Sequence, residues 1–347
     1  MHAAGVEGSM YQQHFDLAKA LFGSPIAGDG SVFLSARLRA VVDNIEIASS
    51  TRDSALVLHG PAGLGKTTIA AHALRNAGTR LAIGWLGDAA QTGTEVLDLL
   101  LGEFGFDVHG QSRGERLQSW RQYLRELGAT DTRAYIAVES AHELPVAALQ
   151  ALDTLTRPDP NGGPGANLVL MGPTRLCGLL DEPALQHLKQ RVRLRQRFAP
   201  FEQAETEAYL VHQIMAAGGN YDAVFRPGAA GAVHAFSAGV PRIINNLCET
   251  VLAVAARRKI PAVTAELVEA TAVGLCGLSP PAADAHVAHE RAVDALLSDA
   301  DGDTDEDAAA LTLESAAREE IPTLTESVEI DIDSGAYELV VEAAASA

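Results

Sequence analysis

Short runs of apolar residues alternate with longer amphipathic stretches over residues 51–200. The short runs predict buried strands, and they cover residues 55–59, 80–86, 134–138, 167–171 and 192–195. The longer stretches carry apolar residues at helical spacing, and they predict helices over residues 66–76, 94–104, 113–128 and 145–156. Strands that alternate with helices predict a mostly parallel sheet with helices on both faces, so the expected fold class is α/β.

The pattern changes on both sides of this α/β domain. Before it, a Gly/Pro-rich turn at residues 23–30 leads to a helical pattern over residues 35–49. After residue 200 only helical spacing is found, and it covers residues 204–216, 227–236, 240–257 and 264–273. After residue 278 Ala, Asp and Glu dominate, which predicts a largely disordered segment. The predicted division is an N-terminal segment (1–50), an α/β domain (51–200), a small all-helical lid domain (201–278) and an acidic tail (279–347).

The net charge of −19 is concentrated in the tail. Residues 279–347 hold 18 carboxylates and two arginines, so they carry −16 and leave only −3 for the other residues. Nonspecific affinity for nucleic acid comes from neutralising phosphates with Lys and Arg, so this balance disfavours a DNA-binding function. The tail also contains alternating apolar residues at 321–332, which predict either a strand added to a partner's sheet edge or an unordered solubilising segment.

Cysteines and apolar runs indicate the compartment. Cys177, Cys248 and Cys276 are too few and too widely spaced for a disulfide framework or a zinc site, so a reducing compartment is expected. No charged-then-apolar leader begins the chain, and no apolar run reaches the roughly 20 residues that cross a bilayer. A soluble, cytoplasmic protein is therefore expected, with Met10 as a second candidate start.

The clearest motif is a phosphate-binding loop. Residues 60–67 fit the pattern G-x-x-x-x-G-K-[ST], and they follow a predicted strand and open a predicted helix. Glycines let successive backbone N–H groups surround a phosphate at the positive end of the helix dipole. ATP and Mg²⁺ are the expected cofactors, with Lys66 on the β- and γ-phosphates and the Thr67 hydroxyl on Mg²⁺. The expected binding residues are Gly60, Pro61, Ala62, Gly63, Leu64, Gly65, Lys66, Thr67 and Thr68.

The predicted strand 134–138 is followed by the second half of such a site. Glu139 stands where an acidic magnesium ligand is expected, although its side chain is one methylene longer than that of Asp. Ser140 occupies the position of the general base, and its hydroxyl cannot take a proton from water at neutral pH. Loss of a positioned base costs on the order of 10²–10⁴ in rate, so slow turnover is expected. His142 or Glu143 could replace the base, but ordinary polar residues at the start of a helix are the favoured interpretation.

Four stretches of the sequence resemble the ExeA/GspA-type AAA+ ATPases of bacterial secretion and pilus systems. The resemblance runs from about residue 10 to residue 272. The four stretches are Met10–Leu17 with Phe22 and Phe33–Ser35, Glu139–Leu144, Leu168–Leu176 with Leu188–Arg191, and the helical-domain motif Gly239–Leu247. The resemblance implies that Arg242 is a sensor-2 arginine that reaches the γ-phosphate. It implies that Arg191 is an arginine finger for a neighbouring subunit, although a solvated strand arginine is an equal alternative.

Departures from the family pattern modify this expectation. Glu139 replaces Asp, Ser140 replaces Glu, and Pro173 stands where the family carries a polar sensor-1 residue. The sequence therefore favours an ATP-binding assembly factor or switch with weak or absent hydrolysis, in a homo-oligomer or with a related AAA+ subunit. An active ATPase motor is the alternative, and a DNA-associated regulator of the transposition-helper kind is disfavoured.

Overall fold

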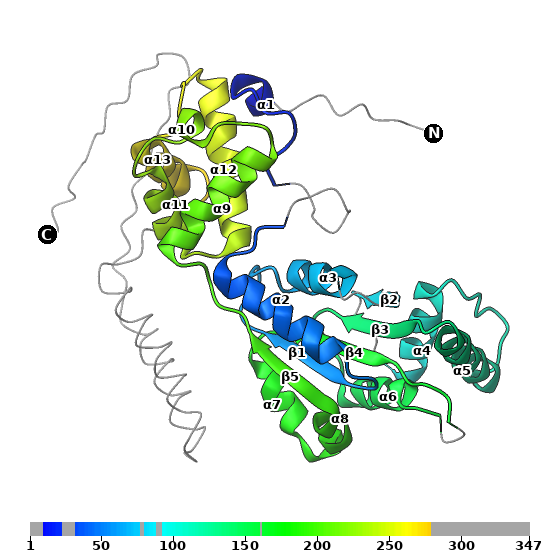
Figure 1. The fold of residues 1–347 in the computed structure, drawn as a ribbon. Coiled ribbons are helices and arrows are strands. Elements are labelled where there is room, and N and C mark those ends of the chain that lie inside the picture. Colours follow the sequence, from blue (N-terminus) through cyan, green and yellow to red (C-terminus); the bar gives the residue numbers. More distant parts are fainter. Residues whose placement is uncertain (1–9, 23–31, 77–79, 88–91, 160–161, 279–347) are drawn as a thin grey trace, which may run out of the picture. The chain divides into compact units, whose positions relative to one another are not determined.

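The computed structural model describes residues 10–22, 32–76, 80–87, 92–159 and 162–278 (Figure 1). The predictions for the tail, for its segment 321–332 and for the Gly/Pro-rich turn near residues 23–30 lie outside the described residues.

A five-stranded parallel sheet forms the centre of the α/β part (Figure 1). The strands are β1 (Ala55–His59), β2 (Leu81–Leu86), β3 (Arg133–Val138), β4 (Asn167–Gly172) and β5 (Val192–Arg197). Their spatial order is β2-β3-β4-β1-β5, so β1 lies between β4 and β5. Because all strands are parallel, their carboxyl ends meet at one edge of the sheet, where loops bind ligands in this class of fold. The predicted parallel α/β fold is confirmed.

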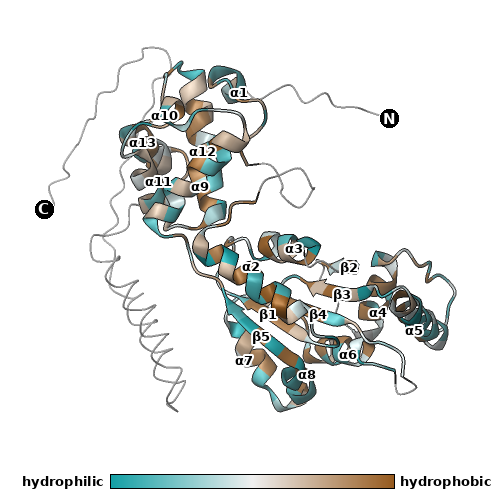
Figure 2. Ribbon diagram, viewed as in Figure 1, coloured by the Kyte–Doolittle hydropathy of each residue, from teal (hydrophilic) through white to brown (hydrophobic). Residues whose placement is uncertain are grey.

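Alternate residues of the strands face two different cores. Leu56 and Leu58 of β1 pack on the side of α2 (Ala36–Ser49) and α3 (Lys66–Asn76). Ala55 and Val57 face the opposite core. The helices that complete this second core are α4 (Gly93–Glu103), α5 (Arg113–Ala129), α6 (Val146–Thr156), α7 (Arg175–Asp181) and α8 (Gln186–Arg191). Burial on both faces explains why β1 and β4 read as unbroken apolar runs (Figure 2).

The edge strand β5 has a different pattern, and it is largely hydrophilic in Figure 2. Arg193 and Arg195 are exposed, whereas Leu194 between them packs against the core. A strand with one buried face and one solvated face alternates in this way. Charged side chains along an edge also discourage pairing with other strands.

Five helices form the helical part, and they are α9 (Gln203–Ala216), α10 (Tyr221–Val224), α11 (Ala229–Ser237), α12 (Pro241–Arg257) and α13 (Ala265–Gly274). The N-terminal segment packs here too, since α1 (Met10–His14) contacts α12. The Phe33 ring lies 5.7 Å from the Phe201 ring and 5.5 Å from the Tyr209 ring. The described residues of the segment 1–50 are therefore joined to their neighbours by apolar contacts.

Short helices account for the differences between the predicted and observed elements. The sequence did not predict α7, α8 and α10, nor the 3₁₀ turns η2 (Ala141–Glu143) and η3 (Pro183–Leu185). None of these five elements exceeds seven residues. Two turns or fewer carry too few apolar positions for a helical period to be recognised.

Gly239 occupies a backbone position that a side chain would disrupt. Its φ is +71°, and an added Cβ would lie 2.0 Å from the backbone oxygen of Phe201. We expect Gly239→Ala to destabilise the fold by roughly 2–4 kcal/mol, because it combines left-handed strain with a backbone clash. Urea unfolding measures the change, and Gly178→Ala, at an exposed position of α7, is the control. No atom lies within 4 Å of an added Cβ at Gly178, so this control should be neutral or stabilising. Equal effects of the two changes would contradict the prediction.

Candidate nucleotide site

The loop between β1 and α3 has the backbone geometry of a phosphate cradle. Gly60, Gly63 and Gly65 have φ values of +141°, +81° and +79°. An added Cβ at Gly60 would lie 2.5 Å from the Phe198 backbone oxygen, whereas nothing lies within 4 Å of one at Gly65. The amides of the first turn of α3 have no intrahelical partner, because an α-helix leaves its first four N–H groups unpaired. The loop can therefore offer several N–H groups to one anion.

Lys66 lies across the mouth of this loop. Its Nζ donates to the backbone oxygens of Gly60 at 2.8 Å and Pro61 at 2.7 Å. Burial lowers the pKa of Lys66, and the nearby Arg242 guanidinium lowers it further. A buried lysine with a second cation beside it marks a position where added negative charge is stabilised. A polyphosphate meets that requirement.

Glu139 and Thr67 line one cavity of about 930 Å³ together with Lys66. Glu139 directly follows β3, and its backbone N–H donates to Leu86 at the end of β2. One carboxylate and one hydroxyl fit Mg²⁺, which takes few protein ligands and keeps waters and phosphate oxygens. The described residues hold no group of three or more His, Cys, Asp or Glu that would bind a metal by themselves. The donor set thus fits a metal delivered with a nucleotide.

The chain turns sharply at Ser140, directly after Glu139. Ser140 has a φ of +47° and is exposed, and its side chain does not cap the η2 turn. The turn places the His142 side chain in a largely buried position, with its Nε2 3.6 Å from the Glu143 carboxylate. Burial lowers the pKa of His142, and Arg175 adds to this effect. The Nδ1 of His142 is buried and has no hydrogen-bond partner among the described residues.

The amino end of α12 lies against the phosphate loop. The Arg242 backbone N–H donates to the Gly63 oxygen at 3.2 Å. An added Cβ at Gly63 would lie 2.9 Å from the Arg242 Cβ, so only a glycine permits this approach without a shift. The exposed Arg242 side chain lines the same cavity as Lys66. These contacts bring the predicted sensor-2 arginine to the predicted phosphate loop.

The N-terminal segment supplies a wall of this cavity that sequence reasoning missed. The lining includes Phe22, Val32, Phe33 and Leu38, and the rings of Phe22 and Phe33 contact Tyr209 of α9. The apolar residues Phe22 and Phe33 were visible in the sequence, but nothing in their spacing tied them to a loop some 30 residues later. A second cavity of about 600 Å³ lies between α5 and α6, and it contains no residue of the phosphate loop.

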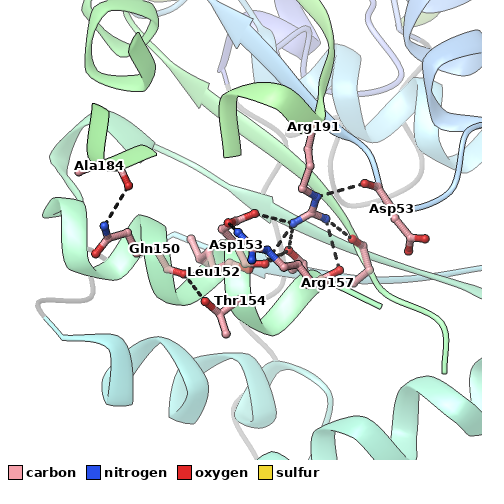
Figure 3. Close-up of polar contacts among 10 residues, drawn as sticks. Asp53, Gln150, Leu152, Asp153, Thr154, Arg157, Ala184 and Arg191 are labelled. Atoms are coloured by element: carbon pink, nitrogen blue, oxygen red, sulfur yellow. Dashed lines mark hydrogen bonds and ion pairs between the residues drawn. The ribbon is translucent and has the colours of Figure 1, made fainter. Parts of the chain in front are cut away.

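Arg191 does not lie where an arginine finger would act. Arg191 directly precedes β5, and the first residue of β5 pairs with the first residue of β1. It therefore lies at the amino end of the strands, whereas the phosphate loop lies at their carboxyl end. Figure 3 shows its guanidinium surrounded by acceptors. It donates to the Asp153 carboxylate at 2.9 Å, to the Thr156 hydroxyl at 2.8 Å, and to the backbone oxygens of Asp53, Asp153, Thr156 and Ala166.

These bonds stay within one chain, and only 14% of the Arg191 side chain is exposed. The prediction of an arginine finger at Arg191 is therefore wrong for this arrangement, because no donor is left for a neighbouring subunit's nucleotide. The alternative of a solvated arginine is wrong as well for Arg191, although it holds for Arg193 and Arg195. Arg191 instead ties α6 and the start of β1 to the start of β5.

Comparison with known proteins finds similar sequences. Residues 49–180 match the AAA domain family. The chain is 27% identical over 252 residues to general secretion pathway protein A of Aeromonas hydrophila, which covers 72% of this chain and 45% of that protein. This confirms the resemblance to ExeA/GspA-type AAA+ ATPases that the sequence predicts. The chain spans less than half of the length of that relative.

Solved structures show the same fold. The ORC2 protein of Aeropyrum pernix, in ADPNP and ADP complexes, has a TM-score of 0.58 at 13% identity, over 70% of this chain and 68% of that one. The ORC1 protein of the same organism, in complex with DNA, has a TM-score of 0.55 at 20% identity, over 72% and 68%. At these identities the likeness establishes the AAA+ fold alone. Among the described residues, no helix is long and apolar enough to span a bilayer.

Proposed function

We propose that the chain binds ATP with Mg²⁺ and acts as a nucleotide-dependent assembly factor or switch in a bacterial secretion, pilus or envelope system. The observation that carries this proposal is the loop at residues 60–67, with three left-handed glycines and Lys66 at the mouth of the 930 Å³ cavity. The similarity to general secretion pathway protein A supports the cellular system.

Each polar group of the cavity has a role in this proposal. Residues 60–68 bind the phosphates through the backbone N–H groups that the loop and the first turn of α3 leave free, with Lys66 on the β- and γ-phosphates. Thr67 and Glu139 hold Mg²⁺, which neutralises phosphate charge when bound. Arg242 reaches the γ-phosphate from α12, so its position depends on which nucleotide is present. A bound triphosphate would therefore hold α12 against the loop. A partner protein would bind this arrangement of α12 differently from the one with ADP.

The proposed partner is a second copy of the chain or a related AAA+ subunit in the cytoplasm. Residues 321–332 of the acidic tail are a candidate contact for another protein. Nucleic acid is disfavoured, because the chain outside the tail carries a charge of only −3. An active ATPase motor remains the second candidate function, and the partly buried His142 beside the cavity favours it.

We expect steady-state ATP hydrolysis far below one turnover per second, because the Ser140 hydroxyl stands in place of a carboxylate that would take a proton from water. Phosphate release by the full chain measures the rate. Ser140→Glu tests the cause, and a rise of about tenfold or more is expected even though the left-handed backbone disfavours the new side chain. A wild-type rate near one per second that disappears in Lys66→Ala would support the motor function instead.

A further inference from the structure

The carboxyl end of β4 lies between the two halves of the candidate site. In the sheet, β4 separates β3, which leads to Glu139, from β1, which leads to the phosphate loop. The Gly60 N–H donates to the Gly172 oxygen at 3.1 Å, so the end of β4 is bonded directly to the first residue of the loop. A side chain at this strand end would therefore face phosphates held by the loop.

The residues of β4 itself leave this place without a side-chain donor. Gly172 has no side chain, and the following Pro173 has neither a backbone N–H nor a polar side-chain atom. Both residues line the 930 Å³ cavity. A group that recognises the outermost phosphate must come from another element.

His142, in the η2 turn that follows the neighbouring strand β3, covers this end of β4. A Cβ at Gly172 would lie 3.1 Å from the His142 Nδ1, so the ring rests on the glycine and any side chain there would press on it. The left-handed turn at Ser140 and the η2 turn after it bring the imidazole to this position. His142 lines the cavity with Lys66, and its side chain is only 10% exposed.

The imidazole retains hydrogen-bonding capacity that the described residues do not use. Its Nδ1 is buried without a partner, and the 3.6 Å from Nε2 to the Glu143 carboxylate is too long for a hydrogen bond. Buried polar atoms in folded proteins are nearly always paired, and exceptions mark unoccupied ligand positions or strain. A neutral imidazole has one N–H donor, and an imidazolium has two.

We infer that His142 contacts the terminal phosphate of ATP and lets this chain distinguish ATP from ADP. The ring donates an N–H to a γ-phosphate oxygen, at the strand end where Gly172 and Pro173 offer no donor. His142 is a binding residue in this account, and no proton transfer is assigned to it. The inference rests on the proposed function, because it requires that the loop at residues 60–67 holds the nucleotide.

Calorimetric titration of the full chain with AMP-PNP·Mg²⁺ and with ADP·Mg²⁺ tests this inference. The ratio of the two affinities is the readout, and no turnover is needed. We expect His142→Ala to lower the ratio roughly tenfold, the effect of one hydrogen bond to a charged group, with ADP affinity unchanged. His142→Gln keeps an N–H donor, so it should retain most of the preference for AMP-PNP over ADP. His187→Ala, on an exposed residue of α8, is the matched control and should leave both affinities unchanged.

The possible outcomes separate the inference from the function on which it rests. An unchanged ratio in His142→Ala, or an equal loss of both affinities, would overturn the role of His142 and leave nucleotide binding standing. The donor role would also be overturned if His142→Gln lowered the ratio of AMP-PNP affinity to ADP affinity as much as His142→Ala does. If wild type binds neither nucleotide, the proposed function fails and the inference fails with it.

Discussion

Lys66→Ala should abolish the stabilisation that ATP·Mg²⁺ gives to the full chain. Lys66 is the charged side chain at the mouth of the loop, where its Nζ already lies within 2.8 Å of the Gly60 and Pro61 oxygens. A ligand that binds only the folded state at a hundredfold excess over its Kd stabilises that state by about 2.7 kcal/mol. Wild type should therefore melt several degrees higher with ATP·Mg²⁺, and the variant should melt at the same temperature with and without it.

A thermal-shift titration provides this measurement, and Lys189→Ala is its matched control. Lys189 pairs with Asp181 on the surface at 3.0 Å, at the amino end of β5 and away from the loop. Its replacement should change the melting temperature little and leave the response to ATP·Mg²⁺ intact. A full ATP response in Lys66→Ala would exclude the loop as the phosphate site.

Arg191→Ala should destabilise the fold by about 3–5 kcal/mol without weakening nucleotide binding. The change removes one partner of the Asp153 carboxylate, whose side chain is 5% exposed, and it removes donors from the backbone oxygens of Asp153, Thr156 and Ala166. Breaking a buried pair by removing one member costs this much, because the remaining charge is uncompensated. Arg157 also pairs with Asp153, so the lower end of the range is expected.

Urea unfolding at a constant m-value measures this loss. Arg193→Ala, two residues further on and exposed, should change the free energy of unfolding by less than about 0.5 kcal/mol. A stable Arg191→Ala variant that binds ATP but no longer assembles with it would restore the arginine-finger role that the structure argues against.

The sheet and the long helices could be predicted from sequence because their signals are local. The strand 55–59 and the helix 66–76 have the predicted bounds, since an apolar run and a lysine-threonine helix start need no distant contact to be recognised. The loop at residues 60–67 was equally readable, because its chemistry lies in consecutive residues. The spatial order of the strands was not predicted, since it depends on contacts between segments far apart in the chain.

The rest of the site depends on contacts over long sequence distances. Phe33 reaches the cavity through packing on Phe201 and Tyr209, more than 160 residues away. Arg191 reads as one member of an alternating arginine series, and only the positions of Asp53 and Asp153 reveal that it is buried. His142 reads as a polar residue at the start of a helix, and only its contact with Gly172 places it at the strand end beside the loop.

Calorimetric titration of the full wild-type chain with ATP·Mg²⁺ tests the central claim most directly. The account predicts saturable binding of one ATP per chain, dependent on Mg²⁺ for full affinity and lost in Lys66→Ala. Binding to wild type and to Lys66→Ala with the same affinity, or no binding of ATP·Mg²⁺ to wild type at millimolar concentration, would contradict it.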